Sequence, residues 1–369
     1  MPDFISLFIS EIKKKRPILE ELLIKRSLSD KSFVSEFIGK IWNKLSDSYQ
    51  FTNKPTFAVD ASQRTLSFSL GPYLIITQAL AIGSNGYEKA LVSLEPVWGS
   101  IPETQLGLLR DLLMQDLEIR LALQIIKENK APLILFIDGS LLSRISYLLR
   151  YLYSFEDENY KNLAREVLIN TLDLINSSKN NVDVISISKS SRNTFLFQIL
   201  SLDNPDIDKT TPYKPTDSEI LSIFTSEPGY TTPLLIGAEM GLGHKQLEII
   251  EKDPNLQNIL NNSPAFYTFY IRLMPRDQFL RIDFPANMVG EKSSILSVNY
   301  FWGKDINIDQ ILGVLRENCV NTKIYQTPLY FVDQIVRIKR EPDLERYIMI
   351  LKTEFPGIIE LDRSQGRFY

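Results

Sequence analysis

Three carboxylate residues occupy positions where an acid is expected to perform chemistry. Asp60 ends a short apolar strand predicted over residues 56–60, and Asp138 ends another over 133–138. Glu118 lies on the apolar face of a long helix predicted to end near residue 129. Strand ends and a facing helix can bring carboxylates together, and such a cluster repels itself unless divalent cations neutralise it. The order strand Asp, helix Glu, strand Asp suggests metal-assisted phosphodiester cleavage.

Glu118 is the most informative of the three because its helical neighbours, among them Met114 and Leu121, form an apolar stripe. A carboxylate in that stripe is costly to desolvate, so it needs a cation, a strong hydrogen bond or an open cleft. Asp116 differs, because Arg120 lies four residues on, the spacing of an exposed ion pair. The alternative, that Glu118 caps a backbone group or reaches solvent, stays open.

Asp60 and Asp138 each precede a small residue and a serine, which is also ordinary turn chemistry. Together with Glu118, and with strands between the first acid and the helix, they match the layout of the ribonuclease-H-like fold. We therefore predict an α/β fold, a mixed sheet flanked by helices with helical additions at both ends. Residues 1–50 are the predicted N-terminal helical segment, and residues 51–369 the predicted nuclease domain.

The elements that must position these acids follow from periodicity and turn residues. We expect strands at 56–60, 65–70, 73–82 and 90–94 to form an antiparallel meander. Ser100 and Glu103 have the spacing of a capping box at the start of the long helix. Residues 203–217, with three prolines, are predicted to form a long surface loop.

Composition excludes several other kinds of site. The 369 residues contain one cysteine and one histidine, which argues against disulfides, thiolate zinc sites and a Ser-His-Asp hydrolase. Any metal must be bound mainly by oxygen, which suits Mg²⁺ and Mn²⁺. The net charge of −4 argues against a protein that coats DNA through general basicity. We find no long apolar run and no signal-peptide pattern, and we expect a cytoplasmic protein without a membrane segment.

Three further residues are candidates for the site. Lys189 follows the strand predicted over 182–188 and could carry phosphate charge into the cleft, although a loop lysine is commonly just solvated. Tyr325 lies shortly before a predicted helix, and in that helix Asp333 has Arg337 four residues on. Spacing alone marks Asp333 and Arg337 as an ion pair on the surface.

The chain resembles the NurA family of archaeal DNA-end-processing nucleases. The resemblance rests on the order of short motifs: Val59-Asp60-Ala61-Ser62, the Arg110–Glu118 helix, Ile137-Asp138-Gly139-Ser140, the strand before Lys189, two strands at 269–273 and 279–283, and the Tyr325 motif. It covers about residues 55 to 340.

This resemblance implies Mn²⁺-dependent (or Mg²⁺-dependent) single-strand endonuclease and 5′-to-3′ exonuclease activity in DNA end resection. It implies a homodimeric ring, two metal ions, DNA with single-stranded and duplex ends as substrate, and partnership with the hexameric HerA translocase. Asp60, Glu118 and Asp138 resemble the family's metal ligands, and Tyr325 resembles the tyrosine that helps place the DNA strand or a metal.

The motifs depart from the family at two positions. Ala61 stands where the family commonly has glycine, and Asp333 stands where it usually has histidine. An acid at 333 either binds metal through water or weakens catalysis, so a ring adaptor for a hexameric translocase that cuts poorly is the alternative function. A sugar-kinase or actin-like phosphotransferase is a third hypothesis, disfavoured because paired glycine-rich phosphate loops are missing.

Overall fold

The structure is a computed structural model that describes residues 3–23, 31–46, 51–130, 132–189, 191–210 and 214–356. The chain divides into two compact units. One comprises Met1–Trp42 and Ser191–Ser226, and the other comprises Asn43–Ser190 and Glu227–Tyr369. The predicted boundary between 1–50 and 51–369 stays a prediction.

The smaller unit is helical in the part that the structure describes. Its helices are α1 (Phe4–Leu23), α2 (Lys31–Ile41), α6 (Phe195–Asp203), α7 (Pro205–Thr210) and α8 (Asp217–Phe224). The buried Asp217 carboxylate accepts hydrogen bonds from the backbone N–H groups of Phe195 (3.1 Å) and Leu196 (2.8 Å). It therefore satisfies free donors at the start of α6 and ties α8 to it.

The larger unit is built on a mixed sheet whose described strands follow the order β1-β7-β9-β10-β6-β5-β2-β3-β4, with β8 paired to β9 and β11 to β8. The strands are β1 (Trp42–Lys44), β2 (Thr56–Ser67), β3 (Tyr73–Gly83), β4 (Glu88–Val97), β5 (Leu133–Asp138), β6 (Val182–Ser188), β7 (Gly229–Thr231), β8 (Leu234–Ile236), β9 (Phe266–Arg272), β10 (Leu280–Pro285) and β11 (Tyr300–Trp302).

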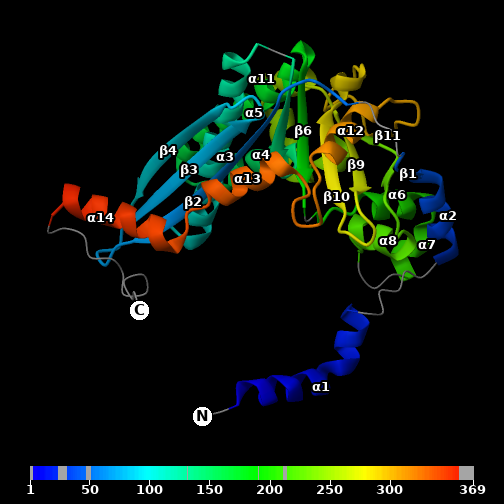
Figure 1. Cartoon of the computed structure of the whole chain (residues 1–369), viewed down its shortest axis with the longest axis horizontal. Coiled ribbons are helices and arrows are strands. Elements are labelled where there is room, and N and C mark those ends of the chain that lie inside the picture. The colour runs from blue at the N-terminus through cyan, green and yellow to red at the C-terminus, as the bar shows by residue number, and fades with distance from the viewer. Residues whose placement is uncertain are drawn as a thin grey trace. The chain divides into compact units, whose positions relative to one another are not determined.

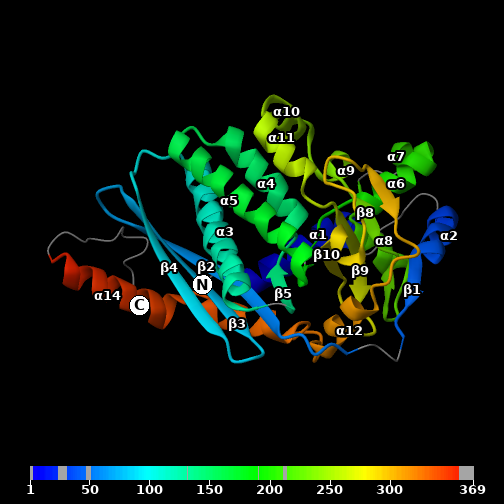
Figure 2. The same ribbon diagram turned by 90° about the horizontal axis from the view of Figure 1, so that it is seen from above.

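Helices cover both faces of this sheet. Figures 1 and 2 show α3 (Glu103–Glu128), α4 (Leu141–Ser154) and α5 (Glu158–Asn176) on one face, and α12 (Asp309–Glu317) and α13 (Thr327–Val336) on the other. The remaining helices of this unit are α9 (Ala238–Gly241), α10 (His244–Lys252), α11 (Pro254–Asn261) and α14 (Glu345–Glu354). The predicted ribonuclease-H-like α/β fold, a mixed sheet flanked by helices, is confirmed.

The centre of the sheet is apolar on both sides. Strand β5, Leu133–Asp138, is buried along its first five residues, as expected of a parallel strand with helices on both faces. Side chains of β5, β6, β9 and β10 pack with those of α12 and α13 in one cluster of buried residues. This core fixes the strand ends that carry the acids.

Strand β2 sets the position of the site because it is longer than its parallel neighbour. It pairs antiparallel with β3 from Phe57 to Ser67, but parallel with β5 only from Thr56 to Val59. Asp60 is therefore the first residue beyond that parallel pairing. The predicted strands 56–60 and 65–70 are in fact one strand, since pairing with β3 continues through the residues between them.

Two other expectations are wrong. Helix α3 begins at Glu103 with Pro102 as its N-cap and has no side-chain cap hydrogen bond, so the predicted Ser100–Glu103 capping box does not form. Residues 203–217 are not a single loop, because helix α7 occupies Pro205–Thr210 and proline fits a first helical turn. Among the described residues no helix is long and apolar enough to cross a membrane.

Candidate active site

Asp60 and Asp138 lie side by side at the carboxyl edge of the sheet. The register pairs Val59 with Ile137, so each acid is the next residue on its strand. Each carboxylate accepts a hydrogen bond from the following backbone N–H, at 2.8 Å from Ala61 and 2.9 Å from Gly139. Gly139 has a φ of +84°, which favours glycine and lets the chain turn from β5 into α4.

Glu118 is buried, and its counterion comes from another helix. Arg144 Nη2 lies 3.0 Å from both carboxylate oxygens of Glu118, and the two side chains are only 9% and 6% exposed. Arg144 sits in the first turn of α4, whose N-cap Ser140 accepts a hydrogen bond from the Ser143 N–H at 3.1 Å. Burial raises the pKa of Glu118, Arg144 opposes that rise, and Asp138 adds to it.

Asp138 is held by a lysine from the neighbouring strand. Lys189 follows β6 and donates to Asp138 Oδ2 at 2.9 Å, and its ammonium lies 5.1 Å from the centroid of the Tyr325 ring. Burial would lower the pKa of Lys189, but Asp138 and Tyr325 outweigh it, so that pKa is raised and the lysine stays charged. Burial, with Asp138, raises the pKa of Tyr325 to about 12, so the phenol keeps its proton.

Asp333 reaches the same neighbourhood from α13. Its carboxylate accepts from Arg337 Nη2 at 3.1 and 3.0 Å, so the predicted pair forms. Strand β2 holds this end of α13, because Ser62 Oγ accepts from the Ile338 N–H at 3.1 Å and Arg64 donates to the Ile338 carbonyl at 3.2 Å.

Burial and the neighbouring acids together raise the pKa of Asp60. Its pKa is raised from 3.8 to about 8, first by burial and then by the charges of Glu118, Asp138 and, with a smaller effect, Asp333. Acids that share a site raise one another's pKa in this way. The four predicted acids and the Lys189–Tyr325 pair therefore lie in one neighbourhood. Their catalytic and metal-binding roles stay predictions.

The carboxylate oxygens are suitable ligands for divalent cations, but their arrangement in this structure does not form a metal site. No three Asp, Glu, His or Cys side chains among the described residues lie close enough together to hold one ion. Glu118 and Asp138 are instead engaged by Arg144 and Lys189. Even so, the donors are all carboxylate oxygens, and the charges of Glu118 and Asp138, which add to burial in raising the pKa of Asp60, are charges that a cation would offset. To bind one shared ion, Glu118 and Asp138 would have to give up their contacts with Arg144 and Lys189.

Arg144 is the residue that sequence reasoning missed. It lies 26 positions after Glu118, so helical spacing cannot connect the two. A usable signal was present, because Arg144 falls within the apolar stripe of α4 beside Leu141, Ile145 and Leu148, all of them buried. An arginine in such a stripe needs a buried acid as its partner. Its Nη1 is also buried and makes no hydrogen bond to any residue that the structure describes.

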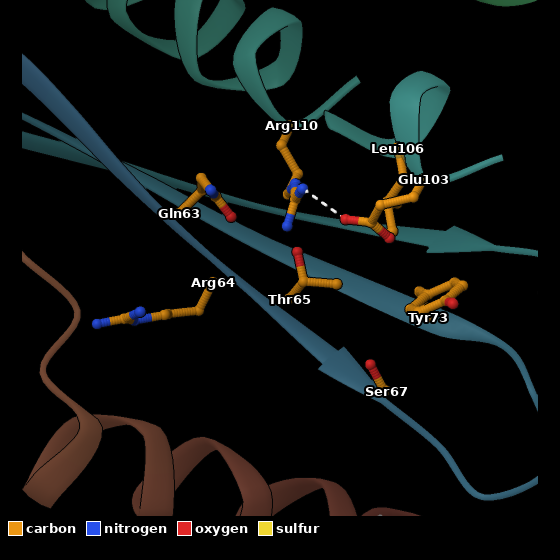
Figure 3. A pocket seen from close by; sticks show the side chains of 8 residues that line it. All are labelled: Gln63, Arg64, Thr65, Ser67, Tyr73, Glu103, Leu106 and Arg110. Carbon is orange, nitrogen blue, oxygen red and sulfur yellow. Dashed lines mark hydrogen bonds and ion pairs between the residues drawn. The ribbon is translucent and has the colours of Figure 1, made fainter. Parts of the chain in front are cut away.

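A polar pocket of about 320 Å³ is lined mainly by residues of β2 and α3 (Figure 3). It is lined by Gln63, Arg64 and Thr65 of β2 and by Arg110 of α3, among others. Arg110 donates to the exposed Glu103 at 3.0 Å, the dashed line in Figure 3. Arg110 precedes Glu118 by eight residues, which places both on similar faces of α3.

The fold and the acids at its carboxyl edge define a protein of the ribonuclease-H-like class. Comparison with known families then gives the particular one. Residues 54–338 match the NurA domain, and the chain belongs to the NurA family. The match spans every residue of the acid cluster.

Individual relatives agree with this assignment. The chain is 27% identical over 364 residues to the DNA double-strand break repair nuclease NurA of Sulfurisphaera tokodaii, covering 94% of this chain and 92% of that protein. Its fold is that of the NurA nuclease of Sulfolobus solfataricus, with a TM-score of 0.60, 18% identity and coverage of 96% and 97%. A further NurA crystal structure matches with a TM-score of 0.54 at 13% identity, covering 93% and 97%.

Proposed function

We propose that this protein is a metal-dependent DNA nuclease that cuts phosphodiester bonds with Mn²⁺ or Mg²⁺ held by Asp60, Glu118 and Asp138. The observation that carries the proposal is the convergence of these acids: the register of β2 and β5 places Asp60 beside Asp138, and the charges of Glu118 and Asp138 add to burial in raising the pKa of Asp60 to about 8. A protein gains nothing in stability from such mutual repulsion. Carboxylates kept together at this cost are typical of functional sites.

The side chains of this protein would divide the work. When bound, the cations would polarise the scissile phosphate and lower the pKa of the attacking water. Lys189 stays protonated beside Asp138 and can offset the negative charge of a phosphate. Tyr325 keeps its proton and can donate a hydrogen bond to the DNA strand. Arg144 opposes the rise that burial causes in the pKa of Glu118.

The finer properties follow from family membership and are part of the proposal. We infer single-strand endonuclease and 5′-to-3′ exonuclease activity on DNA ends, in double-strand break repair. We also infer a homodimer that acts with a HerA-type hexameric ATPase in the cytoplasm. The Sulfurisphaera tokodaii relative is named a DNA double-strand break repair nuclease, which supports the proposed role in double-strand break repair.

The test compares cleavage of labelled single-stranded DNA with Mn²⁺ by the wild type and by Asp60→Asn. This variant keeps the shape of the side chain and removes its charge. The matched control is Asp111→Asn, which removes an exposed acid from α3 outside the cluster. We expect Asp60→Asn to lose at least about 100-fold in rate and the control to cut at the wild-type rate.

Two other outcomes would contradict the proposal. Equal cleavage by Asp60→Asn and wild type would remove the nuclease assignment from these acids. A wild type that binds DNA and the ATPase without cutting would favour the adaptor alternative, in which Asp333 has replaced a catalytic group.

A further inference from the structure

A cavity of about 530 Å³ borders the acid cluster on the side of β10. Part of its wall is formed by Lys189, which donates to Asp138, and by Tyr325, whose ring lies beside the Lys189 ammonium. The rest comes from two loops, one between β9 and β10 with Arg276, and one between α12 and α13 with Lys323. The cavity therefore opens directly beside the candidate active site.

The charges around this cavity are mostly positive. Arg276 and Lys323 are exposed and form no ion pair with any residue in the described ranges, and Lys189 supplies a third cation. Asp277 is the one acid among the lining residues, and its carboxylate accepts the Gln278 N–H at 2.7 Å. A concave surface with more cations than anions attracts a polyanion and concentrates it there.

Both loops hold their cations on an ordered backbone. Arg276 adopts a φ of +60°, a conformation rare for a residue other than glycine, and Arg272 donates to the Asp277 carbonyl at 2.9 Å within the same loop. In the other loop, Asn321 Oδ1 accepts from the Lys323 and Ile324 N–H groups at 2.8 and 2.9 Å. Turns that are already folded thus present Arg276 and Lys323 to the cavity.

We propose that this cavity binds the sugar-phosphate backbone of the substrate strand next to the scissile phosphate, with Arg276 and Lys323 contacting phosphates. The inference rests on the proposed nuclease function. Lys189 links the two regions, because it lines the cavity and touches Asp138. A flexible single strand can follow such a groove through its charge alone, without sequence preference.

The pocket in Figure 3 makes a weaker phosphate site. Its Arg110 already has a carboxylate partner in Glu103, and its Arg64 donates to a backbone carbonyl. A phosphate arriving there would have to compete with these contacts. In the cavity beside Lys189, Arg276 and Lys323 have no carboxylate partner among the residues that the structure describes.

The experiment measures binding of a fluorescent single-stranded oligonucleotide in EDTA, so that cleavage does not occur. The variant is Arg276→Asn with Lys323→Gln, because asparagine tolerates positive φ and glutamine keeps the length of the side chain. Each phosphate contact on a single strand contributes about 0.7 to the slope of log K against log salt, so we expect the slope to fall by about 1.4. Affinity at low salt should fall at least tenfold.

Lys127→Gln is the matched control, since Lys127 is an exposed residue in the last turn of α3 and does not line the cavity. It should keep the wild-type slope. An unchanged slope in the double variant, with a wild-type melting curve, would overturn the inference. A different result would remove the proposed nuclease function: the double variant loses DNA affinity as expected, but the wild type never cuts DNA.

A second readout uses oligonucleotides of increasing length. If the cavity contacts phosphates beyond the scissile one, KM for the wild type should fall as nucleotides are added on one side of the cut. The double variant should lose that gain. An equal gain in both proteins would contradict the proposal.

Discussion

The buried pair of Arg144 and Glu118 gives the sharpest test of the energetics. Arg144→Met removes the positive charge and keeps most of the volume. Glu118 would then be a carboxylate with 6% exposure and no counterion. Removing one partner of a buried ion pair costs about 3–5 kcal/mol, because the remaining charge is uncompensated. We expect that loss in the free energy of unfolding measured with urea, without metal, at neutral pH.

A double-mutant cycle separates this pair from general damage to the fold. Glu118→Gln alone leaves the Arg144 charge buried, whereas Glu118→Gln combined with Arg144→Met leaves neither charge. We expect the combined variant to be more stable than the sum of the single effects predicts, with a coupling energy of about 1–3 kcal/mol. Arg110→Met on the same helix is the control, because its partner Glu103 is 73% exposed and the loss of this pair should cost less than about 1 kcal/mol.

Hydrogen exchange at the α3 amides locates the effect. Faster exchange in α3 and α4 for Arg144→Met, with the rest of the protein unchanged, would agree with loss of this one contact. A cost below about 1 kcal/mol, or a coupling energy near zero, would mean that water reaches Glu118, and the burial argument would be wrong.

Three further predictions concern the charges of the cluster. Because the folded pKa of Asp60 is raised from 3.8 to about 8, its contribution to stability is present below pH 4 and is lost as pH rises toward 8. At about 1.4 kcal/mol per pH unit, reduced by solvent at the half-buried side chain, we expect Asp60→Asn to be about 2–3 kcal/mol more stable than wild type at pH 9 without metal; equal urea midpoints would contradict this. Asp333→Asn removes the acid with the smallest effect on Asp60 and should lower the pKa of Asp60 by less than about one unit, measured by NMR titration; an unchanged pKa would show that Asp333 does not act on the cluster. Lys189→Met should reduce the cleavage rate about 100-fold and stability by about 1 kcal/mol or less, since Lys189 is 38% exposed; unchanged cleavage would exclude a role for this lysine at the phosphate.

Short-range patterns carried much of the information about this fold. The apolar run before Asp138 predicted a buried strand, and the structure has β5 at Leu133–Asp138. Gly71 and Gly86 stand between the strands of the meander, where a turn is expected, and both residues have positive φ. The spacing between Asp333 and Arg337 predicted an ion pair that forms at 3.0 Å. Such features depend on residues within a few positions of one another, so the sequence displays them directly.

Burial is harder to predict from spacing. The four-residue spacing of Asp116 and Arg120 correctly indicated a pair, with 3.0 Å between its atoms, but it suggested an exposed one. Asp116 is in fact only 8% exposed, and burial raises its pKa against the effect of Arg120. The reason is that other elements pack over α3, and spacing along one helix does not show what covers it.

The sequence by itself determined which residues could do chemistry: an acid at each of two strand ends and one on a helical face. Only the tertiary structure decided how they meet. Pairing of β2 with β5 stops at Val59, which brings Asp60 beside Asp138, and α4 carries Arg144 to Glu118 across 26 residues. Contacts between residues far apart in the chain leave no periodic trace. Their desolvation and charge, which raise the pKa of Asp60 to about 8, arise only once the chain has folded.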